Sequence, residues 1–138
     1  MKNIVLFSII LSISQIAKSQ DLKKHQWKNR LLLVFSDDKN SDTFQKQINV
    51  LSENTKGLKE RKLIIYQFSE NKFSIDFNSK WFPIHKLSKK YHSKNKRFEV
   101  LLIGLDGGIK LRQTKLVSLD QLFTLIDGMP MRRHELKN

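Results

Sequence analysis

The sequence contains no cysteine among its 138 residues. A disulfide, a thiolate metal site and a thiol nucleophile are therefore excluded, because each needs a cysteine sulfur. The four histidines (His25, His85, His92 and His134) are scattered without the spacing typical of metal ligands or of a nucleophilic triad. We therefore expect no metal or other cofactor, and we expect packing alone to hold the fold.

Acidic residues are also scarce. The chain has 13 Asp and Glu against 26 Lys and Arg, which gives a formal net charge of +13. Such a charge attracts nucleic acid, anionic glycans, acidic lipid headgroups and acidic proteins. However, no motif for sequence-specific nucleic-acid binding is present, and a composition rich in Lys, Asn and Ile is also what AT-biased coding produces. The charge favours an anionic partner without identifying it.

The chain lacks any apolar run long enough to span a bilayer, which takes roughly 20 residues. Its longest apolar stretch, Ile4 to Ile16, follows Lys2 and precedes the small residues Ala17 and Ser19. This arrangement predicts a signal peptide over residues 1–19, cleaved after Ser19. We expect residues 20–138 to form one exported domain, periplasmic or secreted from a bacterium, with no transmembrane segment.

Apolar patterning predicts an α/β domain in the order β-α-β-α-β-β-α. Continuous apolar runs indicate strands covered on both faces, whereas apolar residues at spacings of three and four indicate helices. A polar segment over residues 69–80 is expected to be a loop, and Asp106-Gly107-Gly108 a hairpin turn. The predicted strands are 30–35, 63–68, 98–103 and the edge strand 109–112; the predicted helices begin at Ser41 or Asp42, at Pro83 and after Ser118.

The helix ends carry recognisable signals. Ser41 or Asp42 can cap the first helix, which should end at Gly57 or run on to Glu60. Ser118 with Gln121 forms a capping box for the last helix, which Gly128 and Pro130 should end.

Three segments carry a resemblance to a known family. They run from Trp27 to Phe35, from Phe98 to Lys110 and from Ile126 to Glu135; their most specific residues are Trp27, Asn29, Arg30, Asp106, Gly107, Gly108, Lys110, Asp127 and Pro130. The chain resembles the bacterial domain-of-unknown-function family grouped with the DUDES domains, which has relatives in extracellular sushi-repeat and matrix-associated proteins. The resemblance implies a thioredoxin-like fold, with a four-stranded mixed sheet flanked by helices and kinship with peroxiredoxins, but no settled activity.

The resemblance also implies where chemistry is missing. In active thioredoxin-like oxidoreductases, the loop after the first strand carries the reactive cysteine and a proline precedes the third strand. Here the loop reads Ser36-Asp37-Asp38-Lys39-Asn40, and Lys96-Arg97 stands before the third strand. We therefore expect a redox-inactive module.

The strongest candidate for partner binding is the C-terminal segment with Met129, Met131, Arg132, Arg133 and Glu135. Apolar methionine beside arginine is typical of protein-binding patches, and the planar guanidinium suits carboxylate, phosphate or sulfate. The same arginines could instead form a structural ion pair with Asp127 or Asp106. A second candidate is the basic face of the helix beginning at Pro83, with Lys86, Lys89 and Lys90, which could equally be a solvated surface.

Two other readings stay open. An enzyme derived from a peroxiredoxin or another oxidoreductase could use non-thiol chemistry at Asp37 and Asp38, beside Lys39, although adjacent aspartates ahead of a helix are common in turns and caps. Alternatively, an envelope-associated protein could be held to anionic surfaces by charge alone.

Overall fold

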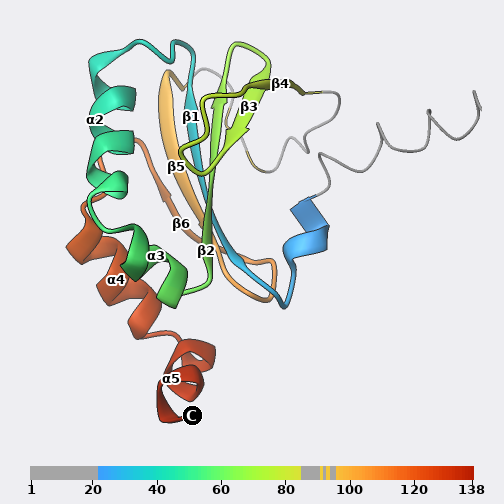
Figure 1. Cartoon of the computed structure of the whole chain (residues 1–138), viewed down its shortest axis with the longest axis vertical. Coiled ribbons are helices and arrows are strands. Elements are labelled where there is room, and N and C mark those ends of the chain that lie inside the picture. Colours follow the sequence, from blue (N-terminus) through green and yellow to red (C-terminus); the bar gives the residue numbers. More distant parts are fainter. Residues whose placement is uncertain (1–21, 85–90, 92, 94–95) are drawn as a thin grey trace, which may run out of the picture.

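The computed structural model describes residues 22–84, 91, 93 and 96–138, which form a mixed sheet with helices against it (Figure 1). The sheet has six strands in the order β4-β3-β2-β1-β5-β6. The strands are β1 (Arg30–Ser36), β2 (Leu63–Ser69), β3 (Lys72–Ile75), β4 (Phe82–Pro83), β5 (Phe98–Ile103) and β6 (Ile109–Gln113). The helices are the 3₁₀ turn η2 (Leu22–His25), α2 (Asp42–Ser52), α3 (Thr55–Glu60), α4 (Leu119–Asp127) and α5 (Pro130–Lys137).

The four predicted strands lie next to one another in the sheet, as β2-β1-β5-β6. Strand β1 pairs in parallel with β2, from Arg30 opposite Leu63 to Ser36 opposite Ser69. It pairs antiparallel with β5, which in turn pairs antiparallel with the edge strand β6. All seven residues of β1 and all six of β5 are buried, as their continuous apolar runs predict for strands covered on both faces.

Helices α2, α3 and α4 cover one face of this sheet (Figure 1). Leu32 and Val34 of β1 lie in one cluster with Phe44 of α2, Leu58 of α3 and Leu122 of α4. The apolar residues that recur at spacings of three and four along α2 and α4 belong to this core or pack against it, which confirms the helices predicted from that pattern. Side chains of β1 alternate, so Arg30 shares a face with Leu32, whereas Leu31 points to the other face.

The other face has an aromatic core. Leu31, Leu33 and Phe35 pack with Tyr66, Phe68 and Phe73, and Leu22 of η2 and the buried Tyr91 join the same cluster. Phe35 and Phe68 stack with ring centroids 4.7 Å apart. Aromatic pairs of this kind add to the stabilisation that comes from burying apolar surface. The sheet therefore has a second hydrophobic core on this face.

The predicted four-stranded sheet is wrong in its strand count, because two further strands lie in and beyond the segment expected to be a loop. Strand β3 follows β2 through a two-residue turn in which Glu70 and Asn71 both have positive φ (51° and 61°). Two successive residues in that conformation define the turn type that fits the twist of a hairpin. The turn places Phe73 in the aromatic core. The burial of this side chain stabilises β3, although the polar composition of the segment predicted a loop.

The helix ends differ from expectation in three ways. The first helical region divides into α2 and α3, because the Asn54 side chain accepts from the Gly57 N–H and starts a new helix. Gly128 ends α4 as predicted, but Pro130 begins α5 at a first-turn position that suits proline. Ser118 caps α4 as predicted, whereas the Gln121 amide donates to Gln113 rather than back to the cap.

Two predictions lie outside the described residues. The signal peptide over residues 1–19 belongs to the undescribed start of the chain. Most of the helix expected over residues 83–92, including Lys86, Lys89 and Lys90, is likewise not described, although Pro83 itself belongs to β4.

Candidate functional site

The loop after β1 is a hydrogen-bonded turn. The Ser36 hydroxyl donates to the Asp38 carbonyl (2.8 Å) and accepts from the Asp38 N–H, and the Asp38 carboxylate accepts from the Asn40 N–H (2.8 Å). Ser41 then caps α2 by accepting from the Phe44 N–H, as predicted. Both Asp37 and Asp38 are exposed to solvent. The side chains of this loop thus build a turn and a helix cap, and within the described part of the chain they form no acid–base pair with a third group.

The loop nevertheless keeps the spatial relation that the fold dictates. The Asp37 N–H donates to the Arg97 carbonyl (3.1 Å), so the end of β1 lies beside the residue that precedes β5. The position expected for a cysteine and the position expected for a proline are therefore neighbours, and neither residue is present.

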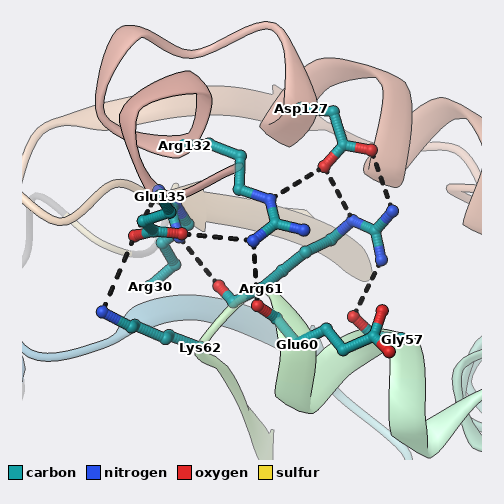
Figure 2. Close-up of polar contacts among 8 residues, drawn as sticks. All are labelled: Arg30, Gly57, Glu60, Arg61, Lys62, Asp127, Arg132 and Glu135. Carbon is teal, nitrogen blue, oxygen red and sulfur yellow. Dashed lines mark hydrogen bonds and ion pairs between the residues drawn. The ribbon is translucent and has the colours of Figure 1, made fainter. Parts of the chain in front are cut away.

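An arginine–carboxylate network lies at the opposite end of β1 (Figure 2). It consists of Arg30, Arg61, Lys62, Asp127, Arg132 and Glu135. Arg132 is buried and makes three contacts: its Nε donates to Asp127 Oδ1 (3.1 Å), and its Nη1 donates to the Glu60 carbonyl (3.0 Å) and to Glu135 Oε2 (3.3 Å). The sequence alternative of a structural ion pair with Asp127 is therefore present in the structure.

Glu135 connects α5 to the start of β1. Both oxygens of its carboxylate accept from Arg30 (3.3 and 3.4 Å), and Arg30 also donates to the Arg61 carbonyl (2.9 Å). Lys62 lies 3.8 Å from the same carboxylate. Arg30 is only 1% exposed and its Nε has no hydrogen-bond partner among the described residues. A buried guanidinium of this kind depends on the carboxylate of α5 for charge compensation.

Arg61 completes the network from the end of α3. Its Nε and Nη2 bind the two oxygens of Asp127 (3.0 and 2.8 Å), and its Nη1 donates to the Gly57 carbonyl (2.9 Å). Its guanidinium also lies 3.8 Å from the centre of the Phe123 ring. A bidentate, stacked arginine combines direction with packing. Nothing in the sequence marks Arg61 or Lys62 as members, and both were missed.

The carboxylates of the network are held in their charged form. The Arg61 hydrogen bonds, with help from Arg132, lower the pKa of Asp127 below its ordinary value. Burial acts to raise the pKa of Glu135, but the hydrogen bonds and charge of Arg30, with Arg132 and Lys62, lower it overall. The network is therefore an electrostatic tie that depends on ionised carboxylates.

The C-terminal segment thus divides into an inner and an outer side. Met129 precedes α5 and packs against the helix-covered core, while Arg132 and Glu135 join the network. The outer side exposes Met131 (42%) and Leu136 (60%), together with Arg133, His134 and Lys137. We call these five residues the α5 outer face.

A cavity of about 200 Å³ lies near the same end of β1, on the other face of the sheet. Its walls are η2 with the turn after it, the start of β1, the end of β5 and the following hairpin turn. The lining residues are Leu22, Lys23, His25, Gln26, Asn29, Leu31, Tyr91, Ile103, Gly104, Asp106 and Gly107. The structure therefore gathers the first two segments of the family resemblance around one hollow, which sequence patterning alone did not reveal.

Hydrogen bonds fix the polar walls of this cavity. His25 Nε2 lies 2.7 Å from the Tyr66 hydroxyl, and Gln26 Nε2 donates to the Asp106 carbonyl (2.9 Å). Burial lowers the pKa of His25, an effect that the charges of Lys24 and Lys28 reinforce. Burial also raises the pKa of Tyr66 to about 12. Both shifts favour the neutral form of the side chain.

The hairpin turn and Trp27 lie beside the cavity. Gly107 adopts a φ of 83°, and Asp106 accepts from the Gly108 N–H (2.9 Å) and from Lys110 Nζ (3.0 Å). These roles confirm the predicted hairpin turn. Trp27 is 63% exposed and has a φ of 69°, held by a hydrogen bond from its N–H to the Leu105 carbonyl. An exposed tryptophan in a strained conformation is uncommon for a residue with only a structural role.

Two classes of site find no support within the described residues. No group of three or more His, Asp or Glu side chains there is arranged to hold a metal ion. No described helix combines the length and apolar character needed to cross a bilayer.

Comparison with known proteins gives a family and a fold. The model of a family described as a domain of unknown function (DUF4174) matches residues 21–135. Among solved structures, the chain is similar to the reduced 2-Cys peroxiredoxin of Plasmodium vivax, with a TM-score of 0.57 and 16% sequence identity over 85% of each chain. This likeness shows a thioredoxin-like fold and nothing about activity. No curated protein matches the sequence.

Proposed function

This chain belongs to the DUF4174 family, a domain of unknown function, and we propose that it is an exported, redox-inactive thioredoxin-like module that binds an acidic protein partner. The absence of cysteine supports the loss of thiol chemistry, since the loop after β1 has become a self-contained turn. Export rests on the signal-like residues 1–19. Kinship with the DUDES domains of extracellular proteins is part of the same proposal.

One observation carries the binding part: α5 is held rigidly on its inner side while its outer side is left to solvent. The arginine–carboxylate network ties Arg132 and Glu135 to β1, to α3 and to α4. The α5 outer face then displays basic side chains between two large apolar ones. A helix fixed in advance loses little conformational entropy on binding, which favours affinity.

The chemistry of this face selects a protein over a polyanionic surface. Met131 and Leu136 offer apolar contact area that a glycan or nucleic-acid backbone does not use, and methionine adapts to varied partner surfaces. Arg133 and Lys137 are spaced by four residues and therefore lie on one side of the helix, where they favour acidic partners. The net charge, +13 for the whole chain and +11 (13 − 2) without Lys2 and Lys18 of residues 1–19, adds long-range attraction to such partners.

The test compares capture of envelope proteins by the immobilised wild-type chain and by three double variants, at low and high salt. The variants are Met131→Ser with Leu136→Ser, Arg133→Ala with Lys137→Ala, and, as the control on α2 and α3, Lys46→Ala with Lys56→Ala. Salt shortens the Debye length from about 10 Å at 0.1 M to about 3 Å at 1 M, which suppresses purely electrostatic binding.

We expect one acidic protein to be captured by the wild type and by the control at high salt. The serine variant should lose this protein, and the Arg133 variant should capture it more slowly and less tightly. Binding that disappears with salt and that the control variant weakens equally would refute a specific face and leave attraction by charge alone.

A further inference from the structure

We propose that the cavity between η2 and the β5–β6 hairpin binds a small organic anion with a ring-sized body, for which ring carboxylates are suitable probes. This site lies on the face of the sheet away from the three packed helices, and it does not depend on the function proposed for α5. It is formed by segments that are distant in the sequence, around residues 22–31 and 103–107, which meet only in the folded domain.

The shape of the cavity sets the size of the ligand. A volume of about 200 Å³ exceeds the roughly 150 Å³ of an engineered cavity that takes up benzene. It is below the roughly 300–1,000 Å³ typical of sites for larger ligands. One six-membered ring with a single substituent therefore fits, whereas a dinucleotide or an oligosaccharide does not.

The lining joins an apolar wall to a polar one. Leu22, Leu31 and Ile103 supply aliphatic surface, and Tyr91 supplies an aromatic side chain. The polar wall holds His25, Gln26 and Asn29, and Gln26 is fixed by its hydrogen bond to the carbonyl of Asp106, another lining residue. An apolar wall with a few convergent polar groups is the usual composition of a small-molecule site.

The charge around the cavity points to an anion. Lys23 lines it, and Lys24 and Lys28 lie next to the lining residues His25 and Asn29 in the sequence. The one carboxylate among the described lining residues, Asp106, is already compensated by Lys110 Nζ at 3.0 Å and by the Gly108 N–H. Positive charge in excess over negative, beside partly buried polar groups, concentrates small anions.

The backbone at Trp27 is strained, and this residue lies in the turn that forms one wall of the cavity. Trp27 stands between the lining residues Gln26 and Asn29, with a φ of 69° that costs a non-glycine residue free energy. The hydrogen bond from its N–H to the Leu105 carbonyl joins this turn to the hairpin, and so sets the separation of two cavity walls. A relaxed turn would not need an exposed tryptophan in this conformation.

Nuclear magnetic resonance titration of the full chain tests the site. The probes are benzoate and glucuronate, which carry one carboxylate on an aromatic and on a sugar ring, with benzamide and glucose as their neutral counterparts. Glycine amides give the readout, since Gly104 and Gly107 line the cavity whereas Gly57 and Gly128 lie in α3 and at the end of α4.

We expect millimolar benzoate or glucuronate to shift the Gly104 and Gly107 signals in a saturable way, leaving Gly57 and Gly128 unchanged. The better of the two anions identifies an aromatic or a sugar body. Lys23→Gln should weaken this binding about threefold, in line with the modest strength of one partly exposed charge contact, while Lys46→Gln should not. Equal binding of the neutral counterparts, shifts spread over all glycines, or no shift with either anion would overturn the proposal.

Discussion

Replacing Arg132 by alanine should destabilise the domain, whereas replacing the neighbouring Arg133 should not. The two arginines are adjacent and chemically identical, but one is 7% exposed inside the network and the other lies on the α5 outer face. The pair is therefore a matched test of the structural role of the network.

The size of the effect follows from the interactions that the Arg132 side chain makes. Removing one partner of a buried ion pair costs about 3–5 kcal/mol, because an uncompensated charge is left behind. Here Asp127 keeps Arg61 and Glu135 keeps Arg30, and Asp127 is itself 36% exposed. The loss should therefore be smaller, about 2–3 kcal/mol, from the three hydrogen bonds of Arg132 and its burial. Arg133→Ala should stay within about 0.5 kcal/mol of wild type.

Urea denaturation followed by circular dichroism measures both free energies of unfolding, and the loss for Arg132→Ala corresponds to a fall in Tm of about 10 °C for a domain of this size. An unchanged urea slope would show that the surface exposed on unfolding stays the same. Equal stability of Arg132→Ala and wild type, or an equal loss in Arg133→Ala, would refute the structural role assigned to Arg132.

Three further changes test other parts of the structure. Because the pKa values of Asp127 and Glu135 are lowered in the folded protein, these carboxylates stabilise it above the ordinary carboxylate range, and this stabilisation is lost as pH falls below about 4. The double variant Asp127→Asn with Glu135→Gln should therefore show a smaller fall of Tm at acid pH than the wild type. An equal fall of Tm in both proteins would contradict this role of the carboxylates. Gln47→Leu should cost about 2–4 kcal/mol in urea denaturation, because the fully buried Gln47 amide binds both the N–H (2.7 Å) and the carbonyl (2.9 Å) of Val117; a neutral result would mean that water replaces the amide. Gly57→Ala should lower the free energy of unfolding by about 1 kcal/mol, because the new Cβ would lie 2.8 Å from the Phe123 ring. Gly128→Ala, whose Cβ would have no contact under 3.5 Å, should be neutral or slightly stabilising. A higher Tm for Gly57→Ala than for Gly128→Ala would contradict this packing.

The parts of the fold that sequence could predict are those with a strong local signal. Strands β1, β2 and β5 are continuous apolar runs, and the hairpin before β6 has two glycines at its turn. Strand β3 was not predicted, because its turn places Glu70 in a conformation that glutamate seldom adopts. A short strand beside polar residues also shows no clear alternation of apolar and polar side chains. Its pairing with β2 and the burial of Phe73 decide its structure, and these are tertiary effects.

The network and the cavity could not be predicted for a different reason. Arg30 and Glu135 are 105 positions apart, and Arg61 and Asp127 are 66 apart. In a chain with twice as many basic as acidic residues, each carboxylate has many possible partners. Proposing an ion pair of Arg132 with Asp127 was possible because the two are close in sequence; choosing Arg61 and Arg30 as the other members requires the fold.

The two candidate binding features, the α5 outer face and the cavity, lie at one end of β1, and the loop without a cysteine lies at the other. At the Ser36 end of β1, the side-chain hydrogen bonds of Ser36, Asp38 and Ser41 serve a turn and a helix cap. At the Arg30 end, successive residues of β1 point to opposite faces: Arg30 enters the network that fixes α5, and Leu31 lines the cavity. Both candidate binding features therefore lie at the Arg30 end of the strand, opposite the loop that follows Ser36. A change at the loop after β1 that keeps its turn should leave both intact, whereas a shift in the register of β1 would disrupt both together, because one residue step exchanges the two faces.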